Sequence, residues 1–355
     1  MIDNWTLRYE GWVPAQEPLR EALCTLGNGI VATRGAAEEV RADGVHYPGT
    51  YFIGGYNRLE SEIGGKTIIN EDLVNFPNWL PIIVRPEGGP WLDPGKLTCE
   101  EYRQDLLLSE GVLVRTYRVR DGKNRETLVQ SRRFVHMAYP HLAAIAVTVT
   151  PLNWSGRLEA RSLLDGSVEN SGVERYRELN SNHLEMIQSG SLGPRSVFLH
   201  VRTTQSHLEV VEAARTRVAR DGEELDVEMQ LLRNGAVVGQ GFSLDVHENE
   251  PVHIEKVMAL FTSRDHGITE VTEDASLAIE CSGRFDDLRR EQEHSWGELW
   301  RQFDVEIDVE PDEDWDDYPI QRVLRLHVFH LLQTASFHTI GRDVSVPARG
   351  LHGEA

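Results

Sequence analysis

Short apolar runs, and positions that alternate between apolar and polar, dominate the chain between Gly111 and Thr262. Alternation with a period of two is typical of a strand with one buried face, and a short continuous apolar run is typical of a strand buried on both faces. The pattern predicts strands over residues 111–120, 125–137, 141–150, 156–164, 195–204, 224–233, 237–246 and 252–261. Strands at this spacing, without long helical patterns between them, predict a mainly β fold built as a large antiparallel β-sandwich.

The first hundred residues combine turn signals with aromatic side chains. Leu26-Gly-Asn-Gly-Ile30 is a turn signal between apolar flanks, and 63–69 has the pattern of a hairpin with Gly64-Gly65 at its tip. Aromatic residues lie beside glycines in 49–57 and return in 75–84. Aromatic rings next to polar groups can stack on sugar rings, but in β-rich segments they more often fill the core. Composition alone favours the core interpretation.

Helical periodicity replaces the strand pattern beyond Ser263. We expect a short helix over 269–281, and the spacing of apolar residues predicts an amphipathic helix over 285–303 and a second one over 320–337. An acidic run over 304–317 separates the last two, and a solvated linker is a better interpretation of it than a cation site, because it lacks the spacing of an EF-hand.

These changes of pattern divide the chain into three regions. We expect the β-sandwich domain over 1–265, a helical linker with the acidic segment over 266–317, and the start of a further helical region over 318–355.

Composition and charge restrict the partners. Hydrophobic residues make up 40% of the 355 residues, so the chain can bury a sizeable core. The formal charge of −21 argues against nucleic acid and anionic membranes, because both bind basic patches. We see no signal peptide and no run long enough for a membrane span, and three widely spaced cysteines fit free thiols in a reducing compartment. We therefore expect a cytoplasmic protein with no nucleic-acid or membrane partner.

Several chemical motifs are excluded. Gly65-Lys-Thr67 resembles the end of a phosphate-binding loop, but Glu60 stands where that motif needs glycine. Gly27-Asn-Gly29 lacks the third glycine and the βαβ context of a dinucleotide site. His327 and His330 share a helix face without a third ligand nearby, so we expect no metal and no cofactor.

The last eleven residues carry the strongest chemical signal. Ser345-Val-Pro-Ala-Arg-Gly-Leu-His-Gly-Glu-Ala355 places an arginine, a histidine and a glutamate around two glycines, directly after a helix pattern. Glycine permits backbone conformations that other residues resist, so the stretch is expected to be a shaped loop, and such loops often carry sites.

Three segments in chain order resemble glycoside hydrolase family 65, the family of maltose, trehalose and kojibiose phosphorylases. The first runs over 20–35 and continues through Gly49-Thr-Tyr-Phe-Ile-Gly-Gly-Tyr56 and Asn75-Phe-Pro-Asn-Trp79. The second is His294-Ser-Trp-Gly-Glu-Leu-Trp300, and the third is the terminal Ile340–Glu354 stretch. Three ordered matches are far more specific than any one of them.

The resemblance implies an N-terminal super-sandwich of the galactose-mutarotase-like kind, a helical linker, an (α/α)6 catalytic barrel and a small C-terminal β-domain. This chain would supply the sandwich, the linker and, over 318–355, only the first helix of a truncated barrel. The apolar face of that helix is expected to lack the neighbours that would cover it.

The same resemblance implies inverting phosphorolysis, in which a glutamic acid protonates the glycosidic oxygen while phosphate attacks the anomeric carbon. The catalytic glutamate of the family lies far beyond Ala355, so we expect no catalytic residue here and leave open whether the chain is an enzyme. Arg349, His352 and Glu354 are the candidate substrate-binding residues, with a structural role about as plausible.

The interpretation we favour is the N-terminal region of an α-glucosidic disaccharide phosphorylase or related hydrolase, inactive by itself. Its partners in the full-length enzyme would be a disaccharide and inorganic phosphate, with a homodimer possible. The alternative is a non-catalytic carbohydrate-binding or dimerisation module, and a sandwich with no role in sugar chemistry is a third. The choice of disaccharide, and of phosphate or water as the attacking group, is open.

Overall fold

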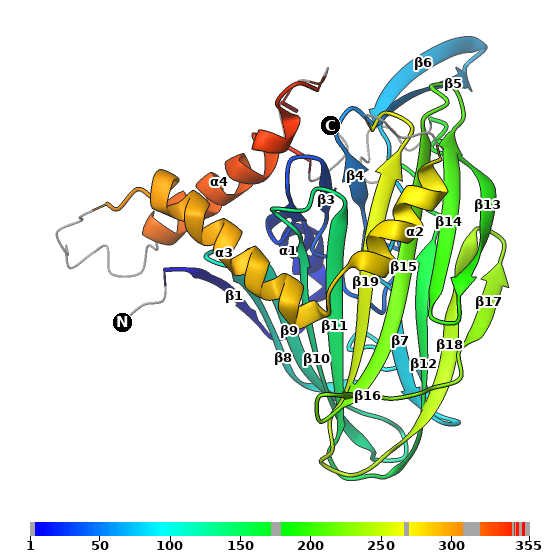
Figure 1. Cartoon of the computed structure of the whole chain (residues 1–355), viewed down its shortest axis with the longest axis vertical. Helices are drawn as coiled ribbons and strands as arrows, with labels where there is room; N and C mark the ends of the chain where they lie inside the picture. Colours follow the sequence, from blue (N-terminus) through cyan, green and yellow to red (C-terminus); the bar gives the residue numbers. More distant parts are fainter. Residues whose placement is uncertain are drawn as a thin grey trace.

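The computed structural model describes residues 4–171, 179–265, 270–307, 320–342, 344, 346–347 and 350–351. Two antiparallel sheets face each other, and three helices lie on the side of the larger sheet (Figure 1). A β-hairpin projects beyond the end of the sandwich at the top of the view (Figure 1). The predicted mainly antiparallel β-sandwich is confirmed.

The larger sheet has ten strands. Its path, from one edge to the other, is β1 (Thr6–Glu10), β8 (Thr98–Leu107), β9 (Val112–Arg120), β10 (Glu126–Val135), β11 (Leu142–Pro151), β19 (Val252–Thr262), β15 (Glu209–Arg220), β14 (Ser196–Thr203) and β13 (Leu184–Gly193), with β16 (Glu223–Glu224) paired to β15.

The second sheet has four strands, and the remaining strands form two small units. The second sheet runs β17 (Gln230–Asn234), β18 (Val237–Val246), β12 (Gly156–Asp165) and β7 (Ile82–Pro86). A three-stranded unit comprises β2 (Leu26–Gly27), β3 (Val31–Thr33) and β4 (Thr50–Phe52), and the projecting hairpin comprises β5 (Tyr56–Ile63) and β6 (Lys66–Leu73).

Most of the predicted strands lie within two residues of their observed bounds. The exception is the range 224–233, where the prediction of a single strand is wrong. Glu223–Glu224 pairs with β15 in the large sheet, whereas Gln230–Asn234 pairs with β18 in the small one. The chain changes sheets between them, so no single strand can run through the range.

The strand β15 shows why the large sheet needs covers on both faces. Val210 and Ala214 belong to the main core between the sheets. Val211 and Ala213 face the other way and pack with Ile279. Because alternate residues of a strand point to opposite faces, apolar residues at successive positions indicate a strand buried on both sides.

The helices that follow the last strand supply that second cover. Helix α2 (Val271–Cys281) packs on β15 and β19, and helix α3 (Phe285–Phe303) crosses the sheet near β11 (Figure 1). Both were predicted, α2 as a short helix over 269–281 and α3 from its periodicity. Before the sheets, a 3-10 turn (Pro14–Gln16) leads into the short helix α1 (Glu17–Leu23).

Helix α4 (Ile320–Thr334) is followed by a 3-10 turn (Phe337–Thr339). One of its faces is covered, which corrects the expectation that its apolar face lacks neighbours. The ring of Phe329 is fully buried and stacks on Trp296 of α3, with ring centroids 4.5 Å apart. Val323 and Leu331, on another face, are exposed.

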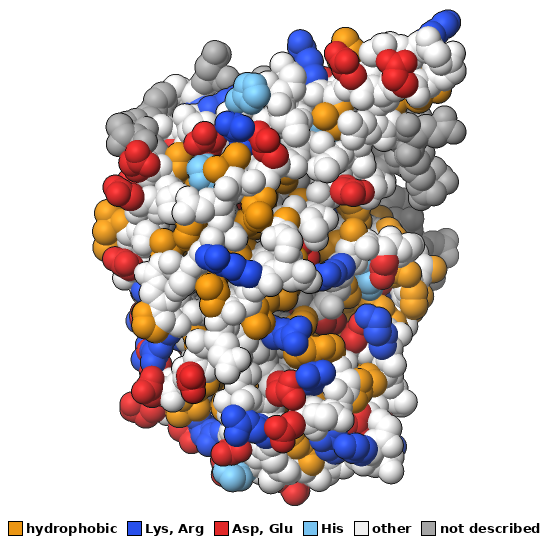
Figure 2. Space-filling view, turned by 90° about the vertical axis from the view of Figure 1, so that its right-hand side faces the viewer, with side chains coloured by type: hydrophobic (Ala, Val, Ile, Leu, Met, Phe, Trp, Pro, Cys, Tyr) orange, Lys and Arg blue, Asp and Glu red, His pale blue; other side chains and the backbone are white. Residues whose placement is uncertain are grey.

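The side of the molecule at the right of Figure 1 mixes basic, acidic and apolar side chains without a patch of one kind (Figure 2). The acidic charge of the chain is therefore not concentrated on this face. Among the described residues, no helix is long and apolar enough to cross a membrane. Cys24, Cys99 and Cys281 are free thiols, of which only Cys24 is fully buried.

Candidate functional site

The three candidate residues of the terminal stretch, Arg349, His352 and Glu354, lie outside the described residues. Two of their neighbours are described. Gly350 has a φ of +75°, a backbone conformation that glycine favours, and its N–H donates to the carbonyl of Pro347 at 3.1 Å. Leu351 is only 2% exposed and belongs to the main core. The stretch therefore returns to the body of the sandwich at Leu351.

The segment that follows α4, which we call the C-terminal segment, lies against two glycines of the N-terminal half. A Cβ at residue 29 would lie 2.2 Å from the Cβ of Ser336, and a Cβ at residue 54 would lie 2.9 Å from Cγ1 of Val344. Both glycines also have positive φ values, +91° and +72°. Real Cβ atoms do not approach this closely, so Gly29 and Gly54 allow the C-terminal segment to dock.

Asn28, between Gly27 and Gly29, fixes the conformation of the loop against which the C-terminal segment docks. The Asn28 carboxamide oxygen accepts from the backbone N–H groups of Ile30 and Val31, both at 3.0 Å. Its amide nitrogen donates to the carbonyls of His136 and Pro140 at 2.9 and 3.1 Å. One buried side chain thus fixes both its own turn and the loop between β10 and β11.

Two polar contacts complete the docking. The ring Nε2 of His338 lies 2.7 Å from the carbonyl oxygen of Met137. Arg342 donates to the buried carboxylate of Asp265 at 2.9 Å. A charge-assisted hydrogen bond of this kind is stronger than a neutral one, so it favours one position of the segment.

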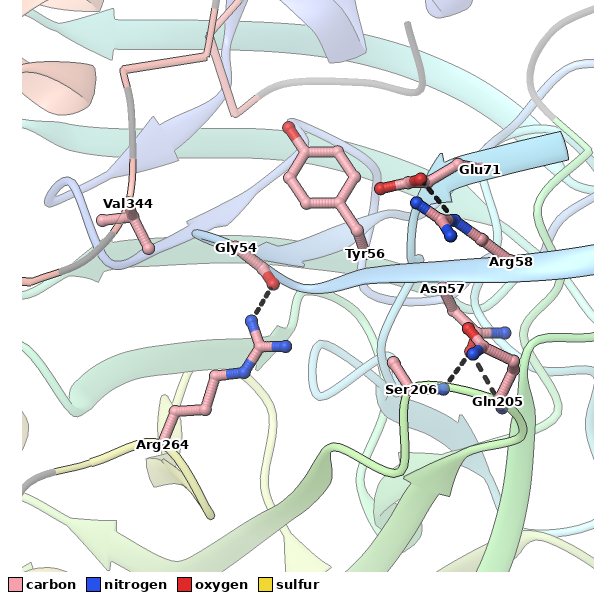
Figure 3. Close-up of a pocket in the computed structure, with 9 residues that line it drawn as sticks. All are labelled: Gly54, Tyr56, Asn57, Arg58, Glu71, Gln205, Ser206, Arg264 and Val344. Atoms are coloured by element: carbon pink, nitrogen blue, oxygen red, sulfur yellow. Dashed lines mark hydrogen bonds and ion pairs between the residues drawn. The ribbon is translucent and has the colours of Figure 1, made fainter.

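A hollow of about 470 Å³ lies beside this docked segment. We call it the Tyr56 pocket; its lining is Gly54, Tyr56, Asn57, Arg58, Glu71, Gln205, Ser206, Arg264 and Val344. Figure 3 shows that these residues come from the hairpin, from the turns after β14 and β19, and from the C-terminal segment.

The polar groups of the Tyr56 pocket are largely engaged with one another. Arg58 pairs with Glu71 at 2.7 Å, and Arg264 donates to the carbonyl of Gly54 (Figure 3). The buried Asn57 carboxamide oxygen accepts from two backbone N–H groups of the turn after β14 at 3.0 and 2.9 Å. The hollow can hold a polar ligand or a neighbouring segment.

Among the described residues that line the Tyr56 pocket there is one carboxylate, Glu71, and so no pair of carboxylates of the kind that glycoside hydrolysis uses. Glu71 is about half exposed and paired with Arg58. Within the described ranges, no group of three or more His, Cys, Asp or Glu side chains could hold a metal ion.

Buried ion pairs hold the loop that joins β3 to β4. Glu38 accepts from Arg133 at 2.8 Å and also from Arg115, which forms a second pair with Glu39. Burial acts to raise the pKa of Glu38, but the charges of the two arginines outweigh it and leave that pKa lowered. Burial dominates at Glu39, whose pKa is raised.

The aromatic residues of the early motifs are core residues. Phe76 and Trp79 are at most 1% exposed, and the indole N–H of Trp79 donates to the hydroxyl of Thr33 at 2.9 Å. The interpretation favoured from composition is confirmed for these two rings. Tyr56, in contrast, is 40% exposed and lines the pocket, which the sequence did not distinguish.

Residues 7–299 match the sequence description "Glycosyl hydrolase family 65, N-terminal domain". The chain belongs to glycosyl hydrolase family 65. The recognition from three ordered segments is thereby confirmed. Gly29 and Gly54, which lie in the first of those segments and its continuation, receive the C-terminal segment.

Relatives in family 65 match nearly the whole chain. An uncharacterized glycosyl hydrolase of Mycobacterium tuberculosis is 39% identical over 353 residues, which are 99% of this chain and 26% of that protein. Kojibiose phosphorylase of Thermoanaerobacter brockii is 29% identical over 99% of this chain and 44% of its own length. Trehalose 6-phosphate phosphorylase of Lactococcus lactis is 25% identical over 99% of this chain and 43% of its own length.

A solved structure supports the fold. A putative kojibiose phosphorylase from the human microbiome superposes on 99% of this chain and 44% of its own with a TM-score of 0.82, at 18% identity. This family 65 chain therefore spans between a quarter and a half of the length of the relatives named here.

Proposed function

We propose that this chain is the N-terminal region of a family 65 disaccharide phosphorylase. In the whole protein, phosphate would attack the anomeric carbon of an α-glucosidic disaccharide while a glutamic acid outside this sequence protonates the departing oxygen. The substrates would be a maltose-, trehalose- or kojibiose-type disaccharide and inorganic phosphate. The setting would be the cytoplasm, in keeping with its free thiols.

The observation that carries the proposal is the docked C-terminal segment. A family match over 7–299 identifies the sandwich, and the segment beyond it is held by Gly29, Gly54 and Asp265 of that sandwich. We propose that this docking positions the terminal stretch with Arg349, His352 and Glu354 at the boundary between the sandwich, over 1–265, and a catalytic domain that begins within 318–355. The helical linker would be 266–317.

In this proposal the sandwich does not carry the catalytic residues, so activity should depend on sequence beyond Ala355. The 355-residue chain, incubated with phosphate and maltose, trehalose or kojibiose, should release no glucose 1-phosphate. The complete gene product, including any reading frame that continues past Ala355, should release it from one of the three. Turnover by the 355-residue chain would show that the catalytic residues lie within it, and a complete product inactive on all three sugars would contradict the assignment.

A further inference from the structure

A second hollow of about 330 Å³ lies apart from the docked segment, between the loop that joins β3 to β4 and the edge strand β7. We call it the His46 pocket. The residues that matter for its chemistry are Trp12, Arg41, Asp43, His46, Asp93 and Lys96. It lies at the lower end of the size range of small-ligand sites, which suits one small molecule.

The most informative residue of the pocket is His46. It is 5% exposed, and its Nδ1 lies 2.9 Å from a carboxylate oxygen of Glu21, which does not line the pocket. Burial acts to lower the pKa of His46, but the hydrogen bond to Glu21 and its charge outweigh burial and raise it. The ring is therefore fixed in position, and its Nε2 has no hydrogen-bond partner among the described residues.

Other polar atoms of the pocket remain available. Asp43 uses Oδ1 to accept from the N–H groups of Val45 and His46, both at 2.7 Å, and its second oxygen makes no hydrogen bond within the described chain. Lys96 pairs with Asp93 at 2.7 Å and keeps two further N–H donors. The pocket thus offers donors and an acceptor side by side.

The charges of the lining largely cancel. Arg115 and Arg133, behind the wall, neutralise Glu38 and Glu39, and Lys96 neutralises Asp93. A ligand with a net charge would gain little in such a site.

The apolar part of the lining includes both aromatic and aliphatic side chains. Trp12 is half-buried and stacks on His46, with ring centroids 5.5 Å apart. Ile83 of β7 and Leu163 of β12 also line the pocket. Apolar surface beside closely spaced donors and acceptors matches a molecule that carries hydroxyl groups on an apolar ring frame.

From this geometry we infer that the His46 pocket binds a neutral hexose unit, with Lys96 donating to its hydroxyl groups, Asp43 accepting from them and Nε2 of His46 forming a hydrogen bond with one of them. The ligand class follows from three features: the available Nε2 of a buried histidine, the cancelled charge and the volume. The site shares no residue with the Tyr56 pocket. It does not depend on the proposed phosphorolysis, because it concerns binding by this chain alone.

The test uses the 355-residue chain at pH 7 with D-glucose and maltose as probes. The long-range ¹H–¹⁵N spectrum of the histidine side chains reports on Nε2 directly, and the signal absent from H46Q identifies His46. Either sugar at millimolar concentration should shift that signal. Asp43→Asn keeps the oxygen that forms the turn and removes the free carboxylate oxygen, so calorimetry should show affinity weakened by about tenfold or more.

Arg58→Ala is the matched control, because Arg58 is an exposed residue of the Tyr56 pocket. It should leave sugar affinity unchanged. No shift of the His46 signal with either sugar would overturn the inference, as would an equal loss of affinity in R58A and D43N. Since D43N retains His46 and the turn, the test stands even if H46Q does not fold.

Discussion

Any residue other than glycine at position 29 would clash with Ser336 and force the backbone to shift. The φ of Gly29 is +91°, and the Cβ of Ser336 fills the place where a Cβ of residue 29 would be, at 2.2 Å. An alanine with this positive φ would lower the stability of the protein by about 1–2 kcal/mol, because its Cβ crowds the backbone in the left-handed conformation. The clash with Ser336 is between segments more than three hundred residues apart, so it links a local motif to the docking of the whole C-terminal segment.

Gly29→Ala should therefore destabilise the protein more than the same change at a glycine with an empty surrounding. Gly222 is the matched control, because its φ is +84° and nothing lies within 4 Å of a Cβ there. In both variants the left-handed backbone lowers the free energy of unfolding. That free energy should fall by about 1–3 kcal/mol more in G29A, because the added methyl group overpacks its site. Urea denaturation measures both. Equal losses would mean that Ser336 does not lie against Gly29.

Lys256 and Glu212 are a second residue-scale feature, fully buried between the sheets. The Lys256 ammonium donates to the carbonyls of Trp79, Pro81 and Leu163 at 2.7–2.9 Å, and so connects the large sheet to β12 and to the chain that leads into β7. Burial lowers the pKa of Lys256 to about 7 and raises the pKa of Glu212 well above its ordinary value.

The sign of the pH dependence follows from these shifts. Between pH 7 and 10.5 the unfolded chain keeps the Lys256 proton that the folded chain loses, so this group makes stability rise with pH, by at most about 1.4 kcal/mol per pH unit. Glu212 acts in the opposite sense above pH 4.5, because the folded state holds its proton longer.

Lys256→Met should remove the Lys256 contribution. The difference in unfolding free energy between the natural protein and K256M should change in favour of the natural protein as pH rises from 7 to 10. Taking the difference cancels tyrosine and thiol titration, and urea melts at three pH values suffice. A difference that does not vary with pH would show that the three carbonyls keep Lys256 fully charged in the folded state.

At the scale of elements, the sequence predicted those strands whose apolar residues follow one clear pattern. Val237–Val246 was predicted at its observed bounds, and the helix α3 followed from its periodicity. The strand β15 was missed because Glu212 and two arginines interrupt its apolar residues, and the burial of Glu212 depends on tertiary contacts. The strand β8 was missed for a similar reason, since its buried Asp105 is compensated by Arg8 of β1.

Helix α4 shows the same limit in another form. Its periodicity predicted an apolar stripe correctly, but no local pattern indicates which part of the stripe has a partner. Phe329 is buried because Trp296 lies thirty-three residues earlier on α3, while Leu331, two positions away, is 64% exposed. Periodicity defines the faces of a helix, and tertiary packing decides which of them is covered.

At the scale of the whole molecule, the family could be recognised from ordered motifs, but the pockets could not. The linings of the Tyr56 and His46 pockets combine residues from loops far apart in the sequence, such as Arg58 with Arg264, and Trp12 with Asp93. Nothing in the local sequence of either pair indicates that they meet. The motif glycines, in contrast, were visible at once, although their partners Ser336 and Val344 were not.

The docking of the C-terminal segment also bears on where the sandwich ends. Leu326, Phe329 and Leu351 are each at most 8% exposed, and Arg325 lies over the ring of Trp5 with its guanidinium carbon 3.7 Å from the centroid. Burying an apolar side chain of this size contributes about 1.5–3 kcal/mol. The described part of the chain after residue 320 is therefore part of the stable unit, even though it belongs, by our proposal, to the start of another domain.

Deleting residues 320–355 should therefore lower the urea midpoint and expose Trp296, which is only 1% exposed in the complete chain. Acrylamide quenching of tryptophan fluorescence reports that exposure, because Trp296 would lose its stacking partner Phe329. Leu331→Ser is the control, since it removes an exposed apolar side chain from the same segment without a buried contact. It should leave both readouts unchanged. A deletion that behaves like L331S would place the limit of the folding unit before residue 320 and make the docked segment a separate body.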